Sequence, residues 1–121
     1  MSYLSERKIV VVTRQTRADE LVKKFNNMAQ AAFYVERMGG DIKDYAEESR
    51  VYKNSVSAAF NRLKDLARVQ LIDREYVPNF IFGDDDVVVV IGQDGLVANT
   101  LKYLNAHPLI AVNPEIGRAH V

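Results

Sequence analysis

Five consecutive β-branched residues, Val87–Ile91, stand directly before Gly92-Gln93-Asp94-Gly95, and this run constrains the fold more than any other feature of the chain. No polar residue alternates along it, which is typical of a strand covered on both faces within a parallel sheet. Lys8–Thr13 shows the same pattern near the start of the chain. Because parallel strands need crossover connections, the two runs predict an α/β fold.

Helical patterns follow the first of these predicted strands. Thr16 is suited to cap a helix, with Asp19 three residues later as its capping-box partner. The pair Asn26-Asn27 is expected to break this helix, so that a second short helix continues beyond it. Apolar residues recur at helical spacing across this region and predict a buried stripe: Leu21, Phe25, Met28, Ala29 and Ala32.

Helices and strands continue to alternate along the rest of the chain. Gly39-Gly40 separates two helical patterns, and the second predicts a long amphipathic helix from Ile42 to Leu66. Arg68–Asp73 and Pro108–Val112 are predicted strands, and a helix from Val97 to Leu104 lies between the last two strands. The expected fold is a three-layer α/β domain with a mostly parallel, Rossmann-like sheet and helices on both faces.

Composition limits the classes of function. A chain of 121 residues fits one domain, and its sixteen Lys and Arg balance sixteen Asp and Glu, so no overall charge attracts nucleic acid or an anionic membrane. There is no cysteine, which excludes disulfides and thiolate chemistry. Since the sequence contains no signal-peptide core and no run of about 20 apolar residues, we expect a cytoplasmic protein without a membrane partner.

The last seven residues differ in character from the rest. Residues 115–121 resemble the translation of a common sequencing adaptor, which predicts that the natural chain was cut near Pro114. We therefore expect residues 1–114 to form an N-terminal α/β nucleotide-binding domain of a longer protein and residues 115–121 to be non-native. His120 then carries no functional weight.

Ligands of open parallel sheets bind outside the carboxyl ends of the strands. Three loops qualify here: Thr13 to Arg17, Gly92 to Leu96, and Asn113-Pro114. In the second loop, two glycines allow backbone N–H groups to approach a phosphate, and the following helix supplies a favourable dipole.

Asp94 lies between those glycines, and its negative charge would repel a phosphate. Two interpretations are open. Asp94 caps the helix, or it accepts a hydrogen bond or a proton from a hydroxyl that is about to be phosphorylated. The tetrapeptide alone is neither a lysine-bearing P-loop nor a three-glycine dinucleotide motif.

The order of segments beyond this loop resembles the NAD kinase family. In that family a hydrophobic strand leads into a Gly-Gly-Asp-Gly-Thr loop, a helix, and a strand that ends in Asn. The resemblance covers roughly residues 86 to 113 and is carried by three segments: Val87–Leu96, Leu101–Leu104 and Pro108–Asn113.

The resemblance implies roles for individual residues. Asp94 takes the position of the catalytic aspartate that orients and deprotonates the 2′-hydroxyl of the adenosine ribose of NAD. Gly92, Gln93 and Gly95 form the nucleotide-binding loop, and Asn113 takes the position of the strand-end Asn near the nucleotide. Apart from the resemblance, Arg14 and Arg17 near the end of the first strand either bind phosphate or are surface arginines without a ligand, and Arg14 is the one that we include in the predicted nucleotide-binding site.

The implied activity is transfer of a phosphoryl group from a nucleoside triphosphate such as ATP, with Mg²⁺, to NAD, which is a step of NADP biosynthesis. Two positions depart from the family pattern, since Gln93 replaces a glycine and Leu96 replaces a threonine. These departures leave the phosphoryl donor open. The family also requires a later Asn-Glu or Asn-Asp motif and a β-rich domain, so we expect residues 1–114 alone to be inactive.

Two other functions stay open: a lipid kinase of the same superfamily, and a nucleotide-binding sensor that has lost turnover. No protein metal site is predicted, because Asp84-Asp85-Asp86 precede a strand and are expected to form a solvated turn. His107 is expected to be a loop residue. The long helix leaves room for a homo-oligomer contact.

Overall fold

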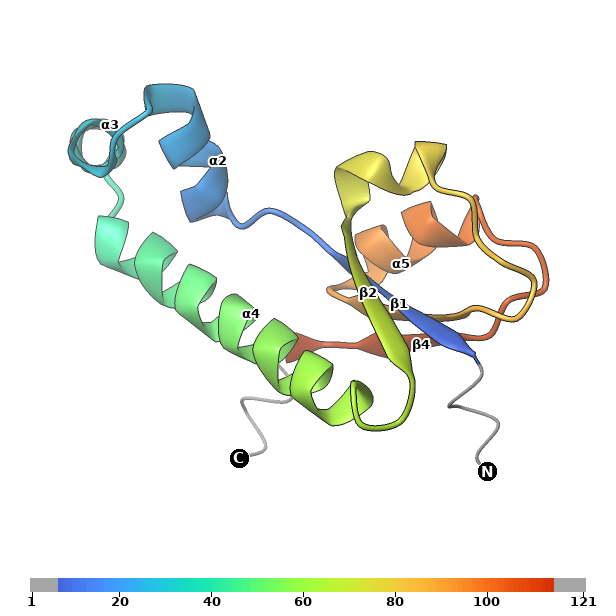
Figure 1. Ribbon diagram of the computed structural model, residues 1–121. Coiled ribbons are helices and arrows are strands. Elements are labelled where there is room, and N and C mark those ends of the chain that lie inside the picture. Colours follow the sequence, from blue (N-terminus) through green and yellow to red (C-terminus); the bar gives the residue numbers. More distant parts are fainter. Residues whose placement is uncertain (1–6, 115–121) are drawn as a thin grey trace. The chain divides into compact units, whose positions relative to one another are not determined.

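The computed structural model describes residues 7–114 (Figure 1). The chain divides into two compact units, of which one comprises residues 15–54 and the other the remainder. We call them the helical unit and the sheet unit, and each is described by itself.

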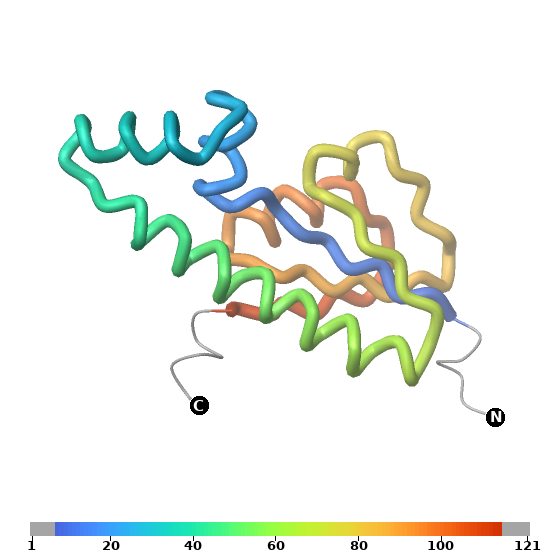
Figure 2. The backbone as a smooth tube through the Cα atoms, turned by 60° about the vertical axis from the view of Figure 1, so that its left-hand side comes forward, coloured from blue at the N-terminus to red at the C-terminus, as the bar shows by residue number. Residues whose placement is uncertain are grey.

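The sheet unit contains four strands, all parallel, in the order β2-β1-β3-β4 (Figures 1 and 2). The strands are β1 (Lys8–Thr13), β2 (Arg68–Asp73), β3 (Val87–Ile91) and β4 (Leu109–Val112). All five residues of β3 are buried, as the unbroken β-branched run predicts. The predicted α/β class and the parallel sheet are therefore confirmed, and the sheet is parallel throughout.

One face of the sheet carries the main hydrophobic core. Val10, Val12, Val88 and Val90 point to this face and are fully buried. Leu96 of α5 (Asp94–Leu101), Val77 of the 3-10 helix η1 (Arg74–Asn79) and Ile72 of β2 complete the cluster. Each fully buried Val contributes about 1.5–3 kcal/mol relative to an exposed one, so this layer stabilises the sheet substantially.

The opposite face is covered along its centre. Val11 and Val89 lie in register on this face and are 0% and 4% exposed, whereas Leu71 and Ile110, next to them on the edge strands, are 47% and 55% exposed. The part of α4 that belongs to the sheet unit, residues 55–63, runs over this face (Figures 1 and 2). Helices thus cover both faces, which confirms the three-layer arrangement.

The helical unit contains α2 (Arg17–Phe25), α3 (Met28–Arg37) and the first part of α4 (Ile42–Leu63). The predicted capping box is present, since the Thr16 hydroxyl accepts from the Asp19 N–H at 3.2 Å and the Thr16 N–H donates to Asp19 at 3.1 Å. Arg17 pairs with Glu48 at 3.1 Å and Lys53 with Asp19 at 3.0 Å. These two ion pairs join α2 to α4.

The predicted break at Asn26-Asn27 is confirmed. Asn26 ends α2 with a left-handed φ of 61°, and the Asn27 side chain caps α3 by accepting from the Gln30 N–H. The single buried stripe predicted across the break is wrong: Met28 and Ala29 are exposed. Because the break changes the direction of the helix, α3 buries Ala31 and Val35 instead.

The long helix α4 also ends earlier than predicted. It ends at Leu63, and Leu66, which was expected to continue the apolar stripe, lies in the following turn and is 48% exposed. Its most buried residues are Ser49 and Tyr52, one turn apart. The predicted interruption of the helical pattern at Gly39 is confirmed, because Gly39 has a backbone φ of +87° that residues with a side chain rarely adopt.

Candidate functional site

The order of the strands locates a topological switch point in the sheet unit. β2 lies on one side of β1, and the chain then crosses to place β3 on the other side. Ligands of open α/β sheets bind outside the carboxyl ends of the strands at such a point. The carboxyl end of β1 is followed by Arg14 and that of β3 by Gly92. Topology therefore selects the Gly92 loop independently of any motif.

The strand register brings three of the predicted residues to this edge. Val12 is in register with Val90, and Ile91 with Val112, so β1, β3 and β4 end near one another. The Gly92 N–H donates to the Val112 carbonyl at 2.9 Å, which fixes Gly92 beside the end of β4. Asn113 follows β4 directly, and Arg14 follows β1. Arg14 and Asn113 are both half-buried and both make interactions within the chain.

The loop itself turns directly from the strand into α5. Gln93 is the N-cap residue, with extended backbone angles of −101° and −176°, and its carbonyl accepts from the N–H groups of Leu96 and Val97 at 3.0 and 3.2 Å. Asp94 is the first helical residue, not the cap. The helix-cap interpretation of Asp94 is therefore wrong, and the interpretation in which its carboxylate faces a ligand hydroxyl stays a prediction.

Charge and hydrogen-bonding capacity at the start of α5 complement each other. Gln93, Asp94 and Gly95 are all exposed. The first N–H groups of a helix have no acceptor within it, and the helix dipole makes this end electropositive. An anionic group can bind those N–H groups, while the Asp94 carboxylate can accept a hydrogen bond from a hydroxyl beside it. A phosphorylated sugar offers both kinds of group.

Leu96 stands where the Gly-Gly-Asp-Gly-Thr loop that this segment resembles has threonine. Its side chain is only 6% exposed and belongs to the core cluster on the α5 face of the sheet. It therefore offers no group to a ligand. The sequence contained no signal for this role, because one leucine early in a helix is compatible with either a core or a surface position.

Arg17 lies in the helical unit, and its side chain makes contacts within that unit. Its guanidinium pairs with Glu48 and stacks over the Tyr45 ring at 4.3 Å from the centroid. The hydrogen bond to Glu48, with smaller contributions from neighbouring charges, raises the pKa of Arg17 against a small opposing effect of burial. These contacts are structural, so Arg14 is the arginine that remains in the candidate site.

The acidic run before β3 is not the uniformly solvated turn that was predicted. Asp84 and Asp85 are exposed, but Asp86 is 5% exposed. Its carboxylate accepts from the Gly83 N–H at 2.7 Å and lies 3.7 Å from the Lys8 ammonium group. Asp86 therefore closes the loop that leads into β3. Among residues 7–114, no group of three or more His, Cys, Asp or Glu side chains is placed to bind a metal.

His107 is a loop residue, as predicted, and it has a clear structural role at the amino end of the sheet. Its Nε2 lies 2.8 Å from the Gly83 carbonyl, and its Nδ1 accepts from the Asn105 N–H at 3.2 Å. This pair of contacts requires the neutral tautomer with the proton on Nε2. The ring also lies against Phe82, with 5.8 Å between centroids. His107 is thus remote from the carboxyl edge and part of the loop's framework.

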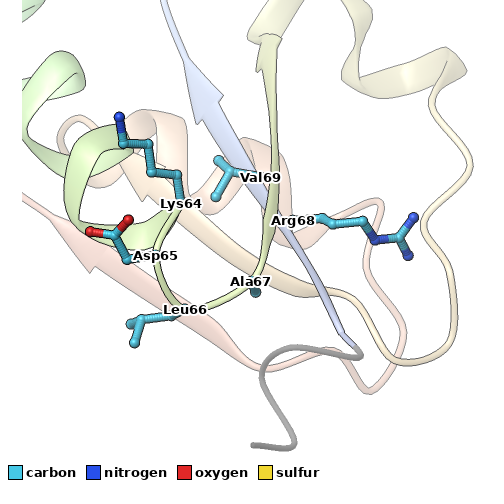
Figure 3. A pocket seen from close by; sticks show the side chains of 6 residues that line it. All are labelled: Lys64, Asp65, Leu66, Ala67, Arg68 and Val69. Atoms are coloured by element: carbon cyan, nitrogen blue, oxygen red, sulfur yellow. The ribbon is translucent and has the colours of Figure 1, made fainter.

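A shallow hollow lies at the turn between α4 and β2 (Figure 3). It is lined by Lys64, Asp65, Leu66, Ala67, Arg68 and Val69. The Lys64 and Arg68 side chains point in different directions and do not converge on one point (Figure 3). Since this hollow lies at the amino end of β2, it is not at the edge where parallel sheets bind ligands.

No protein-family model, curated protein or solved structure matches the chain. Within the described residues, no helix is both long enough and apolar enough to span a bilayer.

Proposed function

We propose that this chain supplies the nucleotide-binding part of an NAD-kinase-like phosphotransferase, which transfers a phosphoryl group from a nucleoside triphosphate to the 2′-hydroxyl of NAD. The observation that carries the proposal is the position of Asp94. It is an exposed carboxylate on the first turn of a helix, at the switch point of a parallel sheet, with a glycine on each side of the Gln93-Asp94 pair.

Each residue of the loop has a place in this chemistry. Asp94 accepts the proton of the attacking hydroxyl, which is the task of a general base. The backbone N–H groups of the first turn of α5, with Arg14, bind phosphate oxygens. Asn113, at the end of the neighbouring strand, contacts the nucleotide. Phosphoryl transfer depends mainly on positioning and on charge neutralisation, and Mg²⁺ enters bound to the triphosphate.

A nucleotide-binding sensor is the second candidate. It is favoured by the burial of Leu96, because the family's threonine hydroxyl is missing and the side chain in its place belongs to the core. The loop still presents backbone N–H groups, so binding survives the substitution while turnover depends on Asp94 and on the rest of the pocket.

Calorimetric titration of the purified chain with NAD and with Mg²⁺-ATP tests the binding part of the proposal. We expect saturable binding of at least one of the two, with affinity in the millimolar range or better. If titration with NAD and titration with Mg²⁺-ATP both give no heat of binding, the proposal is overturned.

Turnover is tested separately, by incubating the purified protein with Mg²⁺-ATP and each candidate acceptor in turn. NADP formation from NAD and ATP supports the kinase, and phosphorylation of diacylglycerol or sphingosine in its place would assign the lipid kinase activity. Binding of nucleotide without either product would assign the sensor.

A further inference from the structure

The helical unit has a hollow of its own, between α2 and α4, and every residue that lines it belongs to this unit. Its volume is about 540 Å³, within the range of about 300–1,000 Å³ that is usual for small-molecule sites. Residues three or four positions apart are neighbours on a helix surface, so one face of each helix supplies the polar lining. These polar residues are Asp19 and Lys23 of α2, and Ser49 and Lys53 of α4.

Four of the lining side chains are apolar. They are Ala18, Val22, Met28 and Ala46. Met28 is 48% exposed, although its spacing in the sequence predicted burial. Methionine is flexible enough to follow the shape of a molecule that packs against it. The hollow therefore offers an apolar surface on which the body of a ligand can be buried.

Ser49 is the most informative residue of the lining. It is only 8% exposed, and its side chain makes no hydrogen bond within residues 7–114. A serine inside a helix often bonds back to the carbonyl four residues earlier, and Ser49 does not. Every fully buried polar side-chain atom in this part of the chain has a partner, so the Ser49 oxygen is open to the hollow. The fold gives this hydroxyl no partner, whereas a polar group bound in the hollow would.

The charged side chains around the hollow do not balance. The Lys53 ammonium lies 3.0 Å from the Asp19 carboxylate, so these two charges offset each other. Lys23 is exposed and has no carboxylate partner within residues 7–114. One positive charge is therefore in excess. A singly charged anion matches it, whereas the second charge of a phosphate would lie uncompensated near Asp19.

We propose that this hollow binds a small monocarboxylate with an apolar body. The Lys23 ammonium pairs with the carboxylate, and the Ser49 hydroxyl donates a hydrogen bond to it. The apolar body lies against Val22 and Met28. The inference does not use the proposed function, because all of these residues belong to the helical unit.

Titration calorimetry of the full chain with octanoate, octanol and octylamine tests the chemistry of the ligand. Octanoate should bind about tenfold more tightly than octanol, because only octanoate adds a charge-assisted hydrogen bond. Octylamine should give no heat of binding, since it brings a second cation beside Lys23. Decanoate should bind more tightly than octanoate, by up to about fourfold for each further CH₂ group that is buried.

Lysine variants test the partner of the carboxylate. Lys23→Met removes the charge, keeps an apolar side chain, and should weaken octanoate binding about tenfold. Lys24→Met is the matched control, because Lys24 is the next exposed lysine of α2 and does not line the hollow. It should leave the affinity for octanoate unchanged.

Variants of α4 test the hydroxyl and the space. Ser49→Ala should melt at the wild-type temperature or above it, since no hydrogen bond within the chain is lost and alanine favours a helix. Its affinity for octanoate should fall about tenfold. Ala46→Leu should weaken binding by filling part of the hollow, whereas Ala58→Leu, at an exposed position of α4 outside the hollow, should not.

Several results would overturn this assignment. If neither octanoate nor decanoate gives a heat of binding, or if octanol binds as tightly as octanoate, the hollow is not a monocarboxylate site. Wild-type affinity for octanoate in Lys23→Met and Ser49→Ala removes the site of the head group. Wild-type affinity in Ala46→Leu places the binding outside the hollow. A fall of about 5 °C or more in the melting temperature of Ser49→Ala gives the hydroxyl a structural role in place of a ligand role.

Discussion

Replacing Asp94 by Asn separates a structural role of this carboxylate from a role in binding. Asp94 is the first residue of α5, it is exposed, and it makes no side-chain hydrogen bond within residues 7–114. Its contribution to the fold is then the attraction of a negative charge to a helix N-terminus, about 0.3–1 kcal/mol. The melting temperature of Asp94→Asn should fall by no more than about 5 °C.

Asp94→Asn should change ligand affinity more than stability. It should weaken the binding of NAD but not that of the triphosphate. A charge-assisted hydrogen bond from a ribose hydroxyl contributes about 1.5–3 kcal/mol, so affinity for NAD should fall by about tenfold to a hundredfold. Affinity for the triphosphate should stay the same or rise, because a negative charge near the phosphate site has been removed. Where turnover is measurable, loss of a general base lowers it by about 10²–10⁴.

Isothermal titration and thermal melting of the same samples provide the assay. Asp84→Asn is the matched control, since it removes one exposed carboxylate at the amino end of the sheet and should change neither affinity. If Asp94→Asn melts normally and binds NAD as tightly as the wild type, the Asp94 carboxylate has no role in binding NAD. A fall in melting temperature of 10 °C or more would show that Asp94 has a structural role that the structure does not reveal.

Two further predictions concern carboxylates that the fold uses. Partial burial raises the pKa of Asp19, but the Thr16 N–H and Lys53 lower it by more, so the net pKa lies below the ordinary value of 3.8. The stability that Asp19 contributes should therefore be complete above about pH 3.8 and lost as the pH falls through the lower folded-state pKa. Unfolding followed by circular dichroism across this range should show the loss in the wild type and a smaller one in Asp19→Asn. Asp86→Ala should destabilise the protein by about 1–3 kcal/mol, because the part-buried Gly83 N–H loses its acceptor, whereas Asp85→Ala, measured by the same denaturant titration, should change stability by less than about 0.5 kcal/mol.

The strands and the main helix breaks were predictable because each depends on local sequence. The β-branched run Val87–Ile91 requires burial on both faces, and Asn26-Asn27 provides both a left-handed residue and a cap. The carboxyl edge of the sheet followed from the parallel order of the strands. The motif then placed Asp94 and Asn113 on that edge.

Other features depend on contacts between distant residues and could not be predicted. Asp86 is buried because Gly83 and Lys8 provide a hydrogen bond and a charge, and Lys8 lies 78 positions earlier in the chain. From the sequence pattern alone, Asp86 was predicted to lie in a solvated turn.

Nucleotide is expected to bind at the carboxyl ends of β1, β3 and β4. Titrating the ¹⁵N-labelled chain with NAD and following its backbone amide resonances tests this most directly. The largest shifts are expected at Gly92, Gln93, Gly95 and Asn113, and the amides of Gly83 and His107 at the opposite edge are expected not to move. Shifts confined to the opposite edge or to the helical unit, or no shifts at saturating NAD and Mg²⁺-ATP, would contradict it.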